Sequence, residues 1–145
     1  MPERHTRPAG KRPALDSYAH MRYTAYVNKA IEAYKAAGEE TRLRILRLLR
    51  QALGELCVCE VVDALEKPQY TVSKSLTVLR NAQLVEERRE GKYMMYRLLH
   101  SPFNDKLFES LDRISDLDPI YEADAQRLTA RLALREDGKC EILYR

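Results

Sequence analysis

The sequence predicts a mainly α-helical domain that carries a β-hairpin. Two short helical patterns, over residues 55–65 and 70–82, are separated by a proline-marked turn at residues 67–69. Two strand-like runs follow over 84–90 and 93–98, with Gly91 and Lys92 between them. A helix–turn–helix followed by a hairpin is the plan of a winged helix-turn-helix module, and modules of this plan read DNA.

Composition limits the class of protein. The 145 residues suffice for one domain with a modest core, and 45% apolar with 32% charged residues is typical of a globular protein. No apolar run is long enough for a membrane-spanning helix, and the N-terminus lacks the apolar segment of a secretory signal. Three cysteines in such a chain suggest reduced thiols, so we expect a cytoplasmic protein with no membrane partner.

The chain divides into three parts. Residues 1–16 are rich in proline and basic residues, and we expect a disordered arm that is either solvated or touches DNA. Residues 17–136 should form the winged helix-turn-helix and dimerisation domain. Residues 137–145 should be a tail that contains Cys140.

Two helices are expected before the helix–turn–helix, over 18–36 and 40–53. In the second, apolar residues recur at helical spacing while four arginines alternate with them, and we expect these arginines to face solvent. The apolar stripe contains Leu43, Ile45, Leu46, Leu49 and Leu53, and the arginines are Arg42, Arg44, Arg47 and Arg50.

The helix over 70–82 should present a polar face of hydroxyls, one tyrosine and bases, because Val72, Leu76 and Leu79 point inward. Residues 69–97 hold six bases and three acids, a surplus of 6 − 3 = 3 that equals the net charge of the whole chain. Such a surface suits phosphate and base-edge contacts. The residues expected to bind double-stranded operator DNA are Gln69, Tyr70, Thr71, Ser73, Lys74, Thr77 and Arg80, with Arg88, Arg89 and Lys92 on the hairpin.

Two more helices should begin at the pairs Ser101-Pro102 and Asp118-Pro119, which are typical helix starts. Their apolar faces have no evident partner in a chain whose core is already supplied by residues 40–98. We therefore expect them to form a homodimer interface together with the helix over 18–36.

Cys57 and Cys59 are the candidate ligands of a thiophilic ion, since thiolates prefer soft ions to magnesium or calcium. On a regular helix they would lie about 200° apart. Shared coordination would therefore require the start of the helix over 55–65 to unwind. Cys140 is the remaining thiol and could complete the site. The alternatives are that Cys57 and Cys59 are small core residues and that Cys140 has no role.

The sequence resembles the ArsR/SmtB family of metal-responsive winged-helix repressors over about residues 18–117. The resemblance is carried by the segments at 40–46, 55–60, 70–76 and 89–93, and above all by Glu-Leu-Cys-Val-Cys at 55–59. It implies a homodimer that leaves its operator when arsenite, antimonite or, as an alternative, cadmium or lead binds the thiols.

Four features depart from the family pattern. Val62 stands where a third cysteine is common in arsenite sensors, and the basic arm lacks the cysteines of cadmium/lead sensors. No histidine follows His100, so we do not expect the zinc site of the C-terminal helices. Gln83 replaces a glycine after the second helix of the helix–turn–helix, which implies strain if that residue is left-handed.

Three other functions are alternatives to this one, two of which use the same winged helix-turn-helix fold. A repressor that senses oxidants or persulfides, pairing Cys57 or Cys59 with Cys140, keeps the fold and changes the signal. A constitutive DNA binder needs no ligand at all. A thiol oxidoreductase is disfavoured because no βαβ pattern accompanies the cysteines, and since no catalytic set of residues is visible, we expect neither an enzyme nor a constitutive cofactor.

Overall fold

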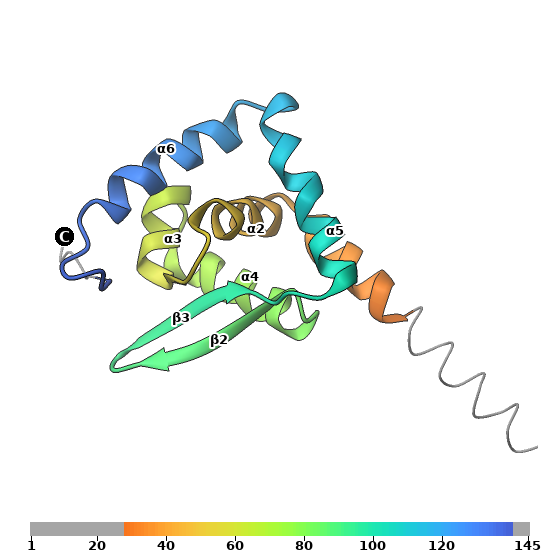
Figure 1. The fold of residues 1–145 in the computed structure, drawn as a ribbon, viewed down its shortest axis with the longest axis horizontal. Coiled ribbons are helices and arrows are strands. Elements are labelled where there is room, and N and C mark those ends of the chain that lie inside the picture. Colours follow the sequence, from red (N-terminus) through yellow and green to blue (C-terminus); the bar gives the residue numbers. More distant parts are fainter. Residues whose placement is uncertain (1–27, 141–145) are drawn as a thin grey trace, which may run out of the picture.

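The computed structural model describes residues 28–140, so the expected arm and the start of the first helix lie outside the described residues. A helix over 28–37 confirms the remainder of that helix. The order along the chain is α2 (Glu40–Ala52), β1 (Leu56–Cys57), α3 (Val58–Leu65), α4 (Gln69–Asn81), β2 (Val85–Glu90), β3 (Tyr93–Leu98), α5 (Pro102–Ser110), a 3-10 helix η1 (Leu111–Asp116) and α6 (Ile120–Leu132). The hairpin extends beside α3 and α4, which confirms the winged helix-turn-helix arrangement (Figure 1).

A three-stranded antiparallel sheet, in the order β1-β3-β2, forms the wing and its base. β1 was not expected, because the sequence predicts a helix from residue 55. Leu56 and Cys57 instead pair with Tyr96 and Met95 of β3. The helix therefore begins three residues later than expected, because the chain first completes the edge of the sheet.

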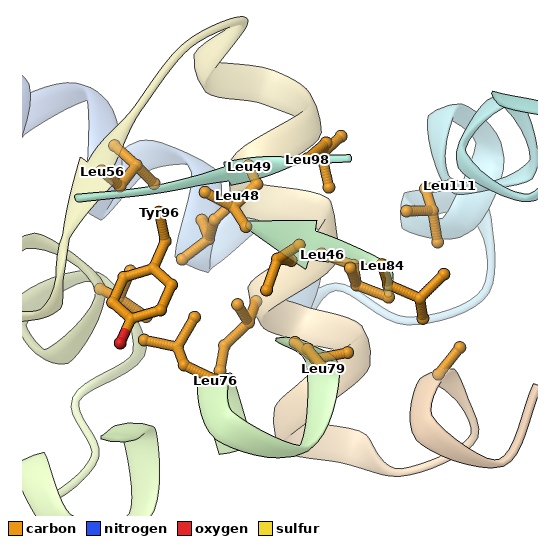
Figure 2. Close-up of a cluster of buried hydrophobic side chains, with 14 of the residues drawn as sticks. Leu46, Leu48, Leu49, Leu56, Leu76, Leu79, Leu84, Tyr96, Leu98 and Leu111 are labelled. Atoms are coloured by element: carbon orange, nitrogen blue, oxygen red, sulfur yellow. The ribbon is translucent and has the colours of Figure 1, made fainter. Parts of the chain in front are cut away.

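One apolar cluster holds α2, α3, α4 and the sheet together. Leu46, Leu76 and Leu79 are fully buried in it, and Figure 2 shows them converging with Leu84 and Leu98. Leu53 does not belong to this cluster, contrary to expectation: it caps α2 in a left-handed conformation and is 90% exposed. The apolar stripe of α2 ends one turn earlier than the sequence suggests.

The arginines of α2 do not form the solvated face that we expected. Arg44 is buried and donates to Asp124 of α6 at 2.7 and 2.8 Å and to the carbonyl oxygen of Leu65 at 3.1 Å. Arg50 pairs with Asp112 of η1 at 2.9 Å, and Arg42 donates to the carbonyl oxygen of Ala36. These guanidinium groups join α2 to other elements because polar partners from distant segments reach them.

The C-terminal helices contribute to the same core. Ser101 caps α5 by accepting from the amide of Asn104 at 3.0 Å, as expected. Phe108, Leu111 and Leu128 are buried against the apolar cluster. The expectation that these apolar faces lack a partner within the chain is therefore wrong for α6 and for much of α5. No helix among residues 28–140 is long and apolar enough to cross a membrane.

Candidate functional site

The end of β1 and the first turn of α3 position two of the three cysteines. Cys57 ends β1 in an extended conformation, and its amide donates to the Glu60 carboxylate at 3.0 Å. Cys59 lies in the first turn of α3, and its sulfur is 2.8 Å from that of Cys57. The sulfurs converge because the two residues belong to different elements. The expectation that α3 must unwind to bring them together is therefore wrong.

Cys140 completes the cluster from the far end of the chain. It forms a disulfide with Cys57, and its sulfur lies 3.1 Å from that of Cys59, which is free. The three sulfurs lie within 4.8 Å of one another, which makes them the one group of metal-ligand side chains found among residues 28–140. Cys57 and Cys140 are almost fully buried beside Met95 and Tyr93. The thiols expected from sequence thus meet at one point, whereas their role as metal ligands stays a prediction.

A short turn brings Cys140 to the cluster. After α6 the chain folds back through an antiparallel bridge between Glu136 and Lys139. Figure 1 shows this turn on the same side of the molecule as the hairpin tip. A cavity of about 380 Å³ between them is lined by residues of both segments, among them Gly91, Tyr93 and Lys139. The cysteine cluster therefore lies between the end of α6 and the wing.

A row of three arginines, Arg127, Arg131 and Arg135, joins α6 and the turn after it to α3. Arg127 donates to the carbonyl oxygen of Ala64 at 2.7 Å. Arg131 donates to Asp63 at 2.8 Å, and Arg135 binds the buried Glu60 carboxylate through two bonds of 2.6 and 2.7 Å. Sequence analysis missed this row, although its spacing of four residues is visible in the sequence as one helix face.

The arginine row also sets the electrostatics of the cluster. Arg131 Nη2 lies 3.7 Å from the sulfur of Cys59. Burial raises the pKa of the Cys59 thiol above its ordinary value, and the nearby Arg131 offsets only part of that effect. The hydrogen bond to Glu60 raises the pKa of Arg135. Cys59 is accordingly held as a thiol near neutral pH.

Helix α4 presents the polar face that the sequence predicts. Val72, Leu76 and Leu79 are buried, as expected. The residues expected to bind DNA lie on the other sides of the helix: Gln69, Tyr70, Lys74, Thr77 and Arg80 are exposed, and Thr71 and Ser73 are partly exposed. Their contacts with DNA stay a prediction.

The basic side chains of α4 and the wing are not equally available for contacts with DNA. Arg88 binds the Glu55 carboxylate through both Nε and Nη2 at 3.1 Å, and Arg80 pairs with Glu87 at 2.7 Å. Lys74, Arg89 and Lys92 have no ion-pair partner among residues 28–140. The surplus of three charges that the sequence predicts is therefore concentrated on these three side chains.

The turn after α4 contains a strained residue. Gln83 has a φ of 60°, which confirms the left-handed conformation considered from the sequence. Its carbonyl oxygen accepts from Asn104 Nδ2 of α5 at 2.9 Å. This contact fixes the exit of α4 relative to α5.

Comparison with known proteins places this fold in a family. Residues 39–87 match the family described as "Bacterial regulatory protein, arsR family". The HTH-type transcriptional regulator MJ1325 of Methanocaldococcus jannaschii is 39% identical over 61% of this chain and 94% of its own length. The arsenical resistance operon repressor of Escherichia coli K12 is 44% identical over 47% of this chain and 57% of the repressor.

A solved structure agrees with this placement. The homodimeric winged helix-turn-helix DNA-binding domain Mb0332 (fragment 1–100) of Mycobacterium bovis is described as a possible ArsR-family regulator. It superimposes on this chain with a TM-score of 0.58 and is 30% identical, covering 74% of this chain and 90% of that one. The chain belongs to the arsR family of DNA-binding transcriptional regulators.

Proposed function

We propose that the chain is a cytoplasmic homodimeric repressor that is released from its operator when arsenite or antimonite binds Cys57, Cys59 and Cys140. The observation that carries this proposal is the convergence of three sulfurs from three separate segments within 4.8 Å. In their reduced form, three thiols can displace the three hydroxyls of arsenous acid: one As(OH)₃ and three thiols give one tris-thiolate complex and three waters. Three donors suit a trigonal ion of this kind.

The surroundings of the cluster favour arsenite over divalent ions. Each nearby arginine has an acidic partner, since Arg131 pairs with Asp63 and Arg135 with Glu60. The tris-thiolate complex of As(III) is neutral, whereas three thiolates around Cd²⁺ or Pb²⁺ leave one negative charge. An uncompensated charge is costly in a buried site, so the neutral complex fits better.

An apolar face supports the homodimer. Tyr34 of the helix over 28–37 and Phe103 of α5 are 62% and 42% exposed, and their rings meet edge to face with centroids 5.7 Å apart. Ile31 lies on the same helix and is 44% exposed. A second copy would bury this surface and place two α4 helices on neighbouring half-sites of DNA.

The disulfide supports a second candidate, a repressor that responds to oxidants. Cys57 and Cys140 are bonded in the structure, and their oxidation by a peroxide would be balanced: two thiols and one H₂O₂ give one disulfide and two waters. The two candidates share Cys57 and Cys140 and differ in their need for Cys59. Arsenite needs all three sulfurs, whereas the disulfide needs two.

A release titration on the reduced protein separates these functions. A duplex enriched from random sequence by the reduced protein serves as operator, and its release is followed against arsenite, antimonite, Cd²⁺, Pb²⁺, Zn²⁺ and peroxide. We expect release of the wild type by arsenite and antimonite at lower concentration than by the divalent ions. Cys59→Ser should lose most of its response to arsenite and keep its response to peroxide, and Cys140→Ser should lose both. A Cys57→Ser/Cys59→Ser variant that is still released by arsenite would refute the metalloid site.

A further inference from the structure

Glu55 lies where the cysteine cluster meets the wing. Its carboxylate holds Arg88 of β2 through three contacts of 3.1–3.3 Å. Its carbonyl oxygen accepts from Arg135 Nη2 at 2.8 Å. Cys57 follows two residues later, and Arg135 precedes Cys140 by five residues. A single residue therefore contacts both a base of the wing and the segment that carries the third thiol.

The cysteine cluster holds the Glu55 segment and the turn after Arg135 together. Cys57 and Cys140 are joined to each other, so Glu55, which directly precedes β1, and the turn that follows Arg135 cannot separate while the sulfurs are gathered. The Glu60 carboxylate strengthens the same connection, because it binds Arg135 and accepts from the amide of Cys57. With the sulfurs apart, only non-covalent contacts hold the Glu55 segment against Arg135.

Arg88 cannot serve Glu55 and a DNA phosphate equally well. A carboxylate bound through both Nε and Nη2 occupies the edge of the guanidinium that a phosphate would use. It also neutralises the charge that draws phosphate. Arg88 is 51% exposed at the edge of the wing, so a phosphate could reach it if Glu55 moved away.

We propose that Glu55 is the positioning residue that couples the cysteine cluster to DNA binding. Joining Cys57 to Cys140, through a shared thiophilic ion or through a disulfide, holds Glu55 against Arg88 and removes that arginine from the DNA contact. Separating the sulfurs loosens the Glu55 segment, and a phosphate then displaces the carboxylate. The signal passes through β1 to the wing, and α3 stays intact. The inference rests on the proposed function only for the identity of the ion.

The test compares the DNA affinity of the full-length protein in two states. In the reduced state the thiols are separate, and in the gathered state an arsenic atom or a disulfide joins Cys57 to Cys140. The gathered state is made in two ways, by arsenite and by hydrogen peroxide, and mass measurement verifies it as an arsenic adduct or as the loss of two hydrogens. In the wild type the slope of log K against log salt should be shallower in the gathered state by about 0.9 for each Arg88. When salt rises from about 50 to 200 mM, DNA binding should therefore weaken about threefold less per Arg88 in the gathered state than in the reduced state.

Glu55→Gln keeps the size of the side chain and removes its charge. In this variant Glu55 no longer competes for Arg88 in either state, whereas Glu90 still contacts its Nη2 at 3.3 Å in both. The slope should therefore be the same in both states and steeper than in the gathered wild type. Arg88→Gln should give the shallow slope in both states. Glu86→Gln is the matched control, because it frees Arg97 from a cross-strand ion pair on the same sheet without touching the cysteine-bearing segments. It should raise affinity in both states and leave the difference between them as large as in the wild type.

The outcomes separate this inference from the proposed function. Equal release of wild type and Glu55→Gln by arsenite would overturn the coupling and leave the metalloid site standing. A state-dependent slope with peroxide but not with arsenite, abolished in Glu55→Gln, would support the coupling and refute arsenite as the signal. A wild type with the same DNA affinity when it is reduced, arsenite-bound and oxidised would overturn both.

Discussion

Helix α3 is packed differently on its two sides. Towards α2 and α4 it buries Val61, Ala64 and Leu65 in the continuous apolar cluster. Along α6 it also meets the row of Arg127, Arg131 and Arg135, which bind carboxylates and carbonyl oxygens of α3. Apolar packing tolerates small shifts at little cost, whereas a guanidinium that must meet particular oxygen atoms fixes a register. We infer that the apolar side supplies stability and the arginine side sets where the cysteines lie.

The largest loss of unfolding free energy is expected when Asp124, the buried carboxylate of α6, is removed. Asp124 accepts from both Arg44 and Arg127, so Asp124→Ala removes the buried carboxylate that they share and leaves them only the exposed Glu40 and Glu66. Removing one partner of a buried pair typically costs about 3–5 kcal/mol of unfolding free energy. Urea unfolding of the reduced protein measures this loss. The variant Arg44→Met/Asp124→Leu should recover most of it, because apolar groups of similar size replace the pair; a double variant as unstable as the single one would contradict the view that this side mainly sets register.

A slightly smaller effect is expected on the apolar side. Leu46 is fully buried, and Leu46→Ala should lower the unfolding free energy by about 3 kcal/mol through lost burial and the cavity left behind. Leu53→Ala is the control on the same segment: because Leu53 is 90% exposed, its change should stay within about 0.5 kcal/mol. Equal losses at the two positions would mean that Leu53 is covered in solution, for example by another copy of the chain.

The smallest effect concerns the turn that follows α4. Gln83→Gly should stabilise the protein by about 0.5–1 kcal/mol, since glycine adopts the left-handed conformation without a clash of Cβ. Ala82→Gly, one residue earlier at a φ of −81°, should destabilise by at least a similar amount, because it raises the chain entropy of the unfolded state and removes a methyl group that packs against the apolar cluster. Thermal unfolding of both variants beside the wild type checks the sign. A destabilised Gln83→Gly would show that its side chain contributes more than its backbone costs.

Local patterns in the sequence predicted the elements that depend on local signals. The spacing of Val72, Leu76 and Leu79 identified α4, and Ser101 with Pro102 identified the start of α5. The polar face of α4 followed from the same spacing, because residues that are not inward must be outward. Each of these predictions used residues within one or two turns of each other.

The features that the sequence did not reveal depend on distant partners. β1 has only two residues, and its pairing with Met95 and Tyr96 lies about forty positions away, while the segment from residue 55 has a helical apolar pattern of its own. Arg44 resembles any charge on a helix until Asp124, eighty residues later, is placed beside it. Periodicity reports which face of an element is apolar and carries no information about which distant charge meets it.

The bond between Cys57 and Cys140 has a topological consequence. Its sequence separation of 83 residues makes a closed ring that contains α3, α4, the wing and all the C-terminal helices, and leaves the helix over 28–37 and α2 outside. A protease cut at the exposed hairpin tip, next to Lys92, would then open the ring without releasing a fragment. The two pieces would migrate together on a non-reducing gel and separate only after reduction, so limited digestion reads the state of the ring without DNA or any ligand.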